Sequence, residues 1–474
     1  MKMMRYFKSI PALLLAVAHF SCAKPPVQKP NILFLFADDL TFEALATSGN
    51  EIKTPHLDKL AENGVVFKNA YNMGGWHGAV CVASRTMLNT GRFLWNARQL
   101  EKKLPAMAAS RSLWPQLLEK AGYSTYFSGK WHVQVSADSL FRVASHIRPG
   151  MPNQTPAGYN RPFKNQKDMW SPWDPKFNGF WKGGKHWSEV LADDAISFIS
   201  DARTQTNPFF MYLAFNAPHD PRQAPKEYVE RYPLDSIDVP ENFMPEYPFK
   251  EEIGSGKNLR DEKLAPFPRT KYAVKVHRQE YFAIITHMDE QIGRVLAALE
   301  KSGMLDNTYI FFSADHGLSV GRHGLLGKQN MFEHSMKAPL IISGAAIPKG
   351  RQINAPVYVQ DIMPSTLELA GAPVPEAVQF KSLLPLVDGR RQQQYSTIYG
   401  AYRHLQRMVR QDNFKLIYYP SIDKTLLFDL EKDPMEMQNL AESPEFRGKI
   451  DELHTELYRL ERETGKNNTD ALRH

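Results

Sequence analysis

The chain has 474 residues, of which 43% are hydrophobic and 23% charged, and a formal net charge of +7. This composition is ordinary for a globular protein with a sizeable core, and beyond the N-terminal segment no apolar run is long enough to cross a bilayer. The mildly basic balance favours an anionic partner, whereas the lack of a Lys/Arg run interleaved with aromatic residues argues against nucleic acid.

Residues 1–22 have the pattern of an export signal, with a basic start followed by a short apolar run over residues 10–20. The sequence Ser21-Cys22-Ala23 admits either ordinary signal cleavage or a bacterial lipobox, in which Cys22 carries the lipid and residues 23–30 form a tether. We favour the lipobox, because a cysteine is otherwise an odd choice there. We therefore expect an exported protein, periplasmic or anchored to the outer membrane of a Gram-negative bacterium, whose only membrane contact is the lipid at Cys22.

Two acidic residues follow the first predicted strand. Residues 31–36 form a continuous apolar run, which predicts a strand buried on both faces of a sheet, and Asp38 and Asp39 lie at its carboxyl end. Adjacent buried carboxylates are costly unless a cation or hydrogen-bond donors compensate them, and open α/β sheets bind ligands at this edge. Taken alone, the pair is explained equally well as a helix cap with a solvated acid.

Cys81 opens a short predicted helix. After export it is the only cysteine left in the soluble body of the chain, which rules out an intramolecular disulfide. We expect Ser84 to cap the helix, Leu88 to face the core and Gly91 to end the helix in a left-handed turn. A helix start favours an anion, and Arg85 adds a positive charge one turn away. The competing interpretation is a buried, unreactive cysteine.

Three later strands end in titratable side chains. The strands are predicted at residues 123–127, 209–215 and 308–312, and the side chains that follow them are Lys130 and His132, then His219, then Asp315 and His316. Lys130 and His132 are two residues apart, so on an extended segment both side chains point the same way. An acid beside an imidazole offers a metal mixed oxygen and nitrogen ligands, although a lone histidine in a turn more often has only a capping role. We expect all these groups to share one edge of a sheet.

Helical patterns separate the strands. They cover residues 113–121, 188–199 and 281–300, and this alternation predicts an α/β fold with a large, mostly parallel central sheet flanked by helices. Short alternating segments after residue 375 predict a smaller α+β subdomain containing an antiparallel sheet, closed by a helix over residues 444–462. We therefore divide the chain into a catalytic domain, residues 31–375, and a C-terminal subdomain, residues 376–474.

The segment Cys81–Arg92 fits the pattern C-x-[PA]-S-R-x-x-L-x-T-G-R at every fixed position. In this respect the chain resembles the type I, formylglycine-dependent sulfatases of the alkaline phosphatase superfamily, and in particular exported bacterial polysaccharide sulfatases. Residues 129–132 are similar to the family's G-K-[WY]-H, and residues 427–434 to its L-F-D-L-x-x-D-P. The resemblance extends from residue 31 to the final helix.

The resemblance implies a modified residue and a metal ion. A maturing enzyme would oxidise Cys81 to formylglycine (3-oxoalanine), the nucleophile. A divalent cation, Ca²⁺ with Mg²⁺ as the alternative, would be bound by Asp38, Asp39, Cys81, Asp315 and His316. His316 departs from most of the family, which carries Asn or Gln there, although one branch shares Asp-His-Gly.

The resemblance also implies roles for the remaining polar residues. Lys130 and Lys328 would hold the sulfate, and Arg85 would lower the cost of the alkoxide at residue 81. His219 or Lys328 would protonate the leaving alcohol, and we favour His219. His132 would accept the proton that is released when sulfate is expelled.

The implied activity is hydrolysis of a sulfate ester on a carbohydrate such as ulvan, carrageenan or a glycosaminoglycan, while small esters such as choline sulfate remain open. One alternative is a phosphomonoester or phosphodiester hydrolase of the same superfamily. Another is a catalytically inactive, glycan-binding lipoprotein, against which the full set of polar residues argues.

Overall fold

The computed structural model describes residues 29–49, 51–150, 155–344 and 346–466. The export segment and Cys22 lie outside these residues. Within the described ranges, no helix is both long enough and apolar enough to cross a membrane.

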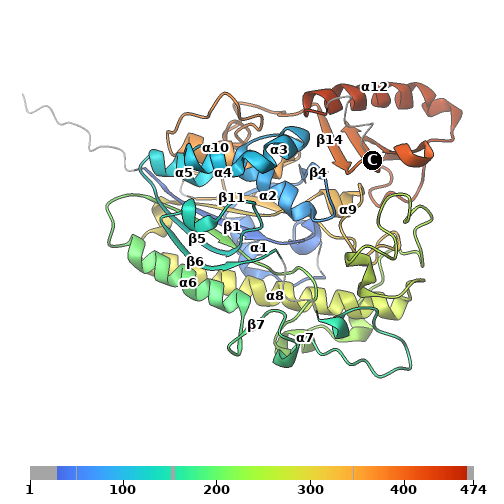
Figure 1. The fold of residues 1–474 in the computed structure, drawn as a ribbon, viewed down its shortest axis with the longest axis horizontal. Helices are drawn as coiled ribbons and strands as arrows, with labels where there is room; N and C mark the ends of the chain where they lie inside the picture. The colour runs from blue at the N-terminus through green and yellow to red at the C-terminus, as the bar shows by residue number, and fades with distance from the viewer. Residues whose placement is uncertain (1–28, 50, 151–154, 345, 467–474) are drawn as a thin grey trace, which may run out of the picture.

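An eight-stranded sheet forms the centre of the protein (Figure 1). Its strands, in spatial order, are β12 (Arg351–Ile353), β2 (Gly64–Phe67), β11 (Leu340–Ser343), β10 (Thr308–Ala314), β1 (Asn31–Ala37), β9 (Phe209–Ala214), β5 (Ser124–Lys130) and β6 (Val143–Arg148). Strands β10, β1, β9, β5 and β6 are parallel neighbours, and only β11 runs antiparallel to the strands beside it. The mostly parallel α/β fold is therefore confirmed.

Helices cover both faces of this sheet, as Figure 1 shows. One layer contains α2 (Val80–Thr90), α3 (Leu94–Leu100), α4 (Leu104–Ala109), α5 (Trp114–Lys120) and α10 (Ile362–Leu369). The other contains α8 (Lys271–Lys301), on which α1 (Pro55–Glu62) and α6 (Trp187–Ala202) both pack. Shorter elements are β3 (Ala70–Tyr71), β7 (Trp181–Lys182), β8 (Lys185–His186), α7 (Lys226–Glu230), α9 (Glu333–Met336), β13 (Val357–Tyr358) and α11 (Leu384–Val387). Because the helices cover both faces, the polar strand ends are left at the edges.

Helix α8 begins ten residues before the helix predicted from the apolar pattern at residues 281–300. Thr270 caps it by accepting a hydrogen bond from the backbone N–H of Ala273. Its first turns carry charged residues that are nevertheless buried, because Glu280 pairs with Arg161 and Arg278 pairs with Glu51. Because ion pairs with distant segments bury these charged residues, the apolar pattern of the sequence does not reveal this part of the helix.

A second sheet forms the C-terminal part, as predicted. It contains β17 (Lys424–Asp429), β16 (Phe414–Tyr419), β15 (Gln406–Gln411) and β14 (Thr397–Tyr402), all antiparallel, and β4 (Gly74–Gly75), which is parallel to β14. Helix α12 (Arg447–Glu463) packs on it. Because β4 belongs to this sheet, the segment that leads to Cys81 is anchored in the C-terminal part of the chain.

Candidate active site

Three carboxylates meet where β1 and β10 end. Ala37 is paired with Ala314 in parallel register, so Asp38 and Asp315 leave the sheet side by side. Asp39 has a left-handed backbone (φ 66°), and its N–H donates a hydrogen bond to Asp315 Oδ1 at 3.0 Å. All three acids are fully buried. Burial, together with the charge of Asp315, raises the pKa of Asp38 well above its ordinary value.

This cluster fits a divalent cation. Ligand atoms of Asp38, Asp39, Cys81 and Asp315 all lie within 4.8 Å of one another. Crowded carboxylates repel one another, and their oxygens are the donors that hard cations prefer. His316 is buried beside Asp315, but its ring nitrogens are not among these atoms and find no hydrogen-bond partner in the described residues. The structure thus brings four of the five predicted ligands together, and the role of His316 stays a prediction.

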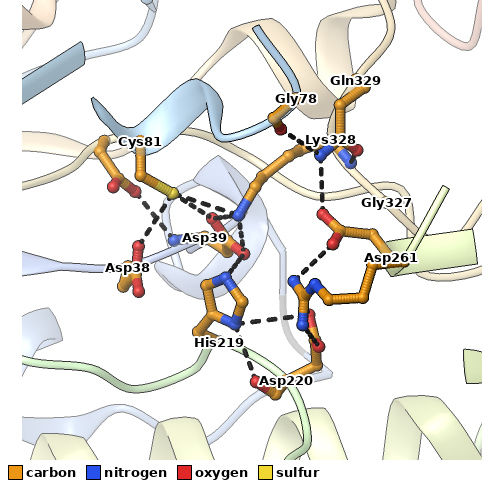
Figure 2. A network of polar contacts seen from close by, with 12 residues as sticks. Asp38, Asp39, Gly78, Cys81, His219, Asp220, Asp261, Gly327, Lys328 and Gln329 are labelled. Carbon is orange, nitrogen blue, oxygen red and sulfur yellow. Dashed lines mark hydrogen bonds and ion pairs between the residues drawn. The ribbon is translucent and has the colours of Figure 1, made fainter. Parts of the chain in front are cut away.

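Cys81 lies at the start of α2 and points into the carboxylate cluster (Figure 2). Its Sγ lies 3.4 Å from Asp38 Oδ1, 3.7 Å from Asp39 Oδ1 and 3.2 Å from Lys328 Nζ. Burial and the charge of Asp315 raise the pKa of the Cys81 thiol well above its usual range. An unmodified thiol at this place is a poor nucleophile, because its thiolate is disfavoured.

Ser84 does not cap the helix, contrary to the prediction. Helix α2 starts at Val80, one turn earlier, with Ala79 as its N-cap. Ser84 lies inside the helix, where its hydroxyl donates to the Asp315 carbonyl at 3.2 Å and accepts from Gln360 Nε2 at 3.1 Å. Its role is therefore to fasten α2 to the loop that carries Asp315.

The predictions for Leu88 and Gly91 of α2 are confirmed. Leu88 is fully buried in the main core, and Gly91 ends the helix with φ 68°. Arg85 is also fully buried, and its Nε donates to Asp315 Oδ2 at 3.2 Å while its Nη1 donates to the Lys130 carbonyl at 2.7 Å. Arg85 thus joins α2 to the ends of both β10 and β5.

Two lysines reach the cluster from different elements. Lys130, the last residue of β5, forms an ion pair with Asp38. Lys328 Nζ donates to both carboxylate oxygens of Asp39, at 2.6 and 2.5 Å. Burial opposes a charge on Lys328, but Asp39 and Cys81 outweigh it and raise the pKa of Lys328 well above its ordinary value. Both ammonium groups are placed to bind an anion next to residue 81.

His219 lies beyond the end of β9. Its Nδ1 donates to the Asp220 carbonyl at 2.8 Å, which leaves Nε2 facing Asp39 Oδ2 at 3.5 Å (Figure 2). Burial and the charges of Lys328 and Lys130 hold the pKa of His219 well below its ordinary value. The nitrogen that faces the cluster is therefore the one free to exchange a proton.

His132 departs from the predicted geometry. Strand β5 ends at Lys130, and His132 has a left-handed backbone (φ 54°), so the two side chains do not follow the alternation of one extended segment. The His132 ring fills the space where a Cβ on Gly150 would lie, only 2.3 Å from it. Burial and the charges of Lys130 and Arg85 lower the pKa of His132 to about 2. The ring lines a cleft of about 600 Å³ that also includes Val82, the residue after Cys81.

The sequence matches a sulfatase family model over residues 30–372, and a model of the C-terminal region of N-sulphoglucosamine sulphohydrolase over residues 321–463. The chain belongs to the sulfatase family. It is therefore a sulfuric ester hydrolase, and the prediction from the Cys81 motif is confirmed.

A sequence relative agrees with this assignment, and solved structures share the fold. An N-acetylglucosamine-6-O-sulfatase of Bacteroides thetaiotaomicron is 27% identical, covering 98% of this chain and 93% of that protein. A structure solved in complex with its substrate D-glucosamine-2-N,6-O-disulfate matches with a TM-score of 0.73 at 24% identity, covering 94% of this chain and all of that one. A phosphonate monoester hydrolase from Silicibacter pomeroyi matches with the same TM-score at 20% identity, covering 92% and 96%, respectively. At these identities the two structures show the shared fold alone.

Two residues that support this site, Gln329 and Asp261, were not predicted from the sequence. Gln329 accepts a hydrogen bond from the Lys328 N–H at 3.1 Å and donates to the Gly78 carbonyl at 3.1 Å and to Asp261 at 2.8 Å. Gln329 therefore ties the lysine loop to the loop ahead of Cys81 (Figure 2). Only its position next to Lys328 could have indicated a role for Gln329. No motif around Asp261 in the sequence indicated a role for that residue.

Proposed function

We propose that this sulfatase removes sulfate from a sulfated saccharide, with a formylglycine made from Cys81 as its nucleophile. The observation that carries the proposal is the position of residue 81, whose side chain enters a buried group of three carboxylates and contacts Lys328. A saccharide substrate is supported by the relative described as an N-acetylglucosamine-6-O-sulfatase and by the neighbour that binds a glucosamine disulfate.

The proposed metal is Ca²⁺, with Mg²⁺ as the alternative, because the cluster offers carboxylate oxygens. Asp38, Asp39 and Asp315 would hold it together with the modified residue 81, and His316 is proposed as a further ligand. When bound, the cation stabilises negative charge on the sulfate oxygens and on the attacking oxygen.

The proposed reaction has two steps. One hydroxyl of the hydrated formylglycine would lose its proton to solvent, at a cost that Arg85 lowers, and the resulting alkoxide would attack sulfur while Lys130 and Lys328 hold the sulfate oxygens. The bond from sulfur to the leaving oxygen breaks, and His219 supplies the proton to the alcohol, with Lys328 as the alternative donor. His132 then removes the proton of the second hydroxyl. The bond between the residue 81 carbon and the sulfate oxygen breaks, which releases sulfate and restores the aldehyde.

The first test concerns residue 81. Intact-mass analysis of active protein should show conversion of Cys81 to the aldehyde, and Cys81→Ala should lose sulfate release from aryl and saccharide sulfates. The expected loss is at least about a thousandfold, because removing a nucleophile leaves only binding and electrostatic effects. Full activity of Cys81→Ala would overturn the mechanism.

A phosphate or phosphonate ester hydrolase is the second candidate, favoured by the fold shared with the phosphonate monoester hydrolase. Rates on 4-nitrophenyl sulfate, 4-nitrophenyl phosphate and a phenyl phosphonate ester separate the two. A higher kcat/KM for either phosphorus ester would identify sulfate esters as a secondary substrate class.

The cellular setting is also a proposal. We propose an exported protein with a lipid on Cys22, matured at Cys81 by a separate enzyme. Fatty-acid labelling of the wild type and of Cys22→Ser, followed by membrane fractionation, tests the anchor. Label and membrane association that survive in Cys22→Ser would exclude it.

A further inference from the structure

Arg148 is a buried cation at the same sheet edge as the active site. It ends β6, the strand beside β5, and is paired in register with Lys130. The Trp131 N–H also donates to the Arg148 carbonyl at 3.3 Å. The two strands therefore deliver Lys130 and Arg148 to neighbouring positions.

The guanidinium of Arg148 lacks the compensation that the other site cations have. It is only 6% exposed, its Nη2 is fully buried, and it donates no hydrogen bond to any described residue. The guanidinium lies over the ring of Trp187, 4.0 Å from the ring centroid, and this ring attracts the cation but accepts no hydrogen bond in the ring plane.

Asp194 is the acid that raises the pKa of Arg148, but its carboxylate already has other partners. Asp194 raises the pKa of Arg148, but burial outweighs it and lowers this pKa to about 10, so the side chain is charged at neutral pH. The Asp194 carboxylate accepts from Ser128 at 2.6 Å and contacts His146 at 2.9 Å. By contrast, Arg85 and Lys328 each contact a buried carboxylate. A buried cation without hydrogen-bonded anions is costly, which points to an anionic ligand.

Arg148 also lines a cleft that such a ligand could occupy. It lines the cleft of about 600 Å³ that contains His132 and Val82. Asp138 is the acid among the lining residues, and it is exposed at the rim. The cleft therefore leads from the nucleophile helix to Arg148.

We propose that Arg148 binds a second anionic group of the substrate, a carboxylate or a further sulfate on the saccharide, while the reacting sulfate lies at residue 81. The inference rests on the proposed function and deepens it, because it makes the preferred substrate a saccharide with at least two negative charges. The planar guanidinium can bind either group through two parallel hydrogen bonds.

Inorganic sulfate probes this site without catalysis. Melting temperatures are measured in sodium sulfate and in sodium chloride at equal ionic strength. Wild type should gain more from sulfate than Arg148→Met, and Arg148→Lys should retain part of the gain and serves as the comparison if Arg148→Met does not fold. Arg142→Met, at the residue just before β6, is the matched control and should behave like wild type. Equal gains in wild type and in Arg148→Met and Arg148→Lys would overturn the inference.

Kinetics give a second readout. The kcat/KM of Arg148→Gln for glucosamine-2-N,6-O-disulfate should fall about tenfold to a hundredfold further than its kcat/KM for 4-nitrophenyl sulfate, mainly through KM, as expected for lost charge-assisted hydrogen bonds. Equal losses on both substrates would contradict the proposed contact. If wild type releases sulfate from neither, the proposed function fails, and the melting experiment alone decides the role of Arg148.

Discussion

His219 and Lys328 both contact Asp39, and either could protonate the leaving alcohol. His219 Nε2 lies 3.5 Å from Asp39, whereas Lys328 contacts Asp39 and the residue 81 side chain at once. A group that contacts the nucleophile is well placed to hold the sulfate, while one farther from it can lie beside the leaving oxygen. This geometry is compatible with the preference for His219 as the acid.

The dependence of kcat on the leaving group distinguishes the residue that protonates the alcohol from the residue that binds the sulfate. For His219→Gln, kcat should fall about a hundredfold or more with an alkyl or saccharide sulfate, but much less with 4-nitrophenyl sulfate, because a stable phenolate needs little protonation. Lys328→Met should impair both substrates, because sulfate binding does not depend on the leaving group. The measurement is kcat across a series of leaving groups. If the selective loss occurs in Lys328→Met instead, Lys328 is the acid.

At the scale of elements, the site depends on loops that polar side chains fix in place. Asp361 is an example away from the chemistry: it lies fully buried beyond β13 and accepts hydrogen bonds from the backbone of Tyr358 and Lys381 and from the side chains of Gln394 and Tyr395. Burial raises its pKa to about 6 although these donors lower it, so the carboxylate is ionised at pH 7. One carboxylate thus fastens the connection between α10 and β14.

Asp361→Asn should destabilise the protein by about 1–3 kcal/mol at pH 7, because the amide NH₂ would face two hydrogen-bond donors. Denaturant unfolding measures the change. Asp388→Asn, at an exposed carboxylate in the same connection, is the control and should unfold like wild type. An unchanged midpoint for Asp361→Asn would show that these donors do not depend on the carboxylate.

At the scale of the whole molecule, the second hydrophobic core joins α2 to the C-terminal sheet. Val80, Ala83 and Met87 of α2 belong to the same buried cluster as Ile398 and Tyr399 of β14. The indole of Trp95 also donates to the Tyr399 hydroxyl at 2.9 Å. The helix that carries Cys81 is therefore packed between the two parts of the chain.

A chain truncated after residue 375 should not fold cooperatively, because it loses the partner of β4 and exposes one side of α2. We expect no sharp unfolding transition and no sulfatase activity. A chain ending at residue 466 keeps every described residue and is the control. A cooperative transition for the shorter chain, measured by calorimetry, would show that residues 31–375 fold independently.

Much of this organisation could be predicted because it is local in the sequence. Apolar runs marked β1, β9 and β10, and the polar residues at their ends identified the site. The start of α8 and the whole of β6 were not predicted, because charged residues of α8 are buried by distant partners and β6 has an exposed, weakly apolar pattern. Arg148 was therefore missed along with its strand.

The sequence by itself determined the family, the α/β class and the chemical groups at the sheet edge, since motif spacing and apolar periodicity are properties of short segments. Only the tertiary structure decided that Ser84 fastens α2 to Asp315, that His132 turns away from the β5 alternation, and that β4 joins the C-terminal sheet. Each of these depends on contacts between segments far apart in the chain. Pairing and burial across such distances are set by the packing of the whole molecule.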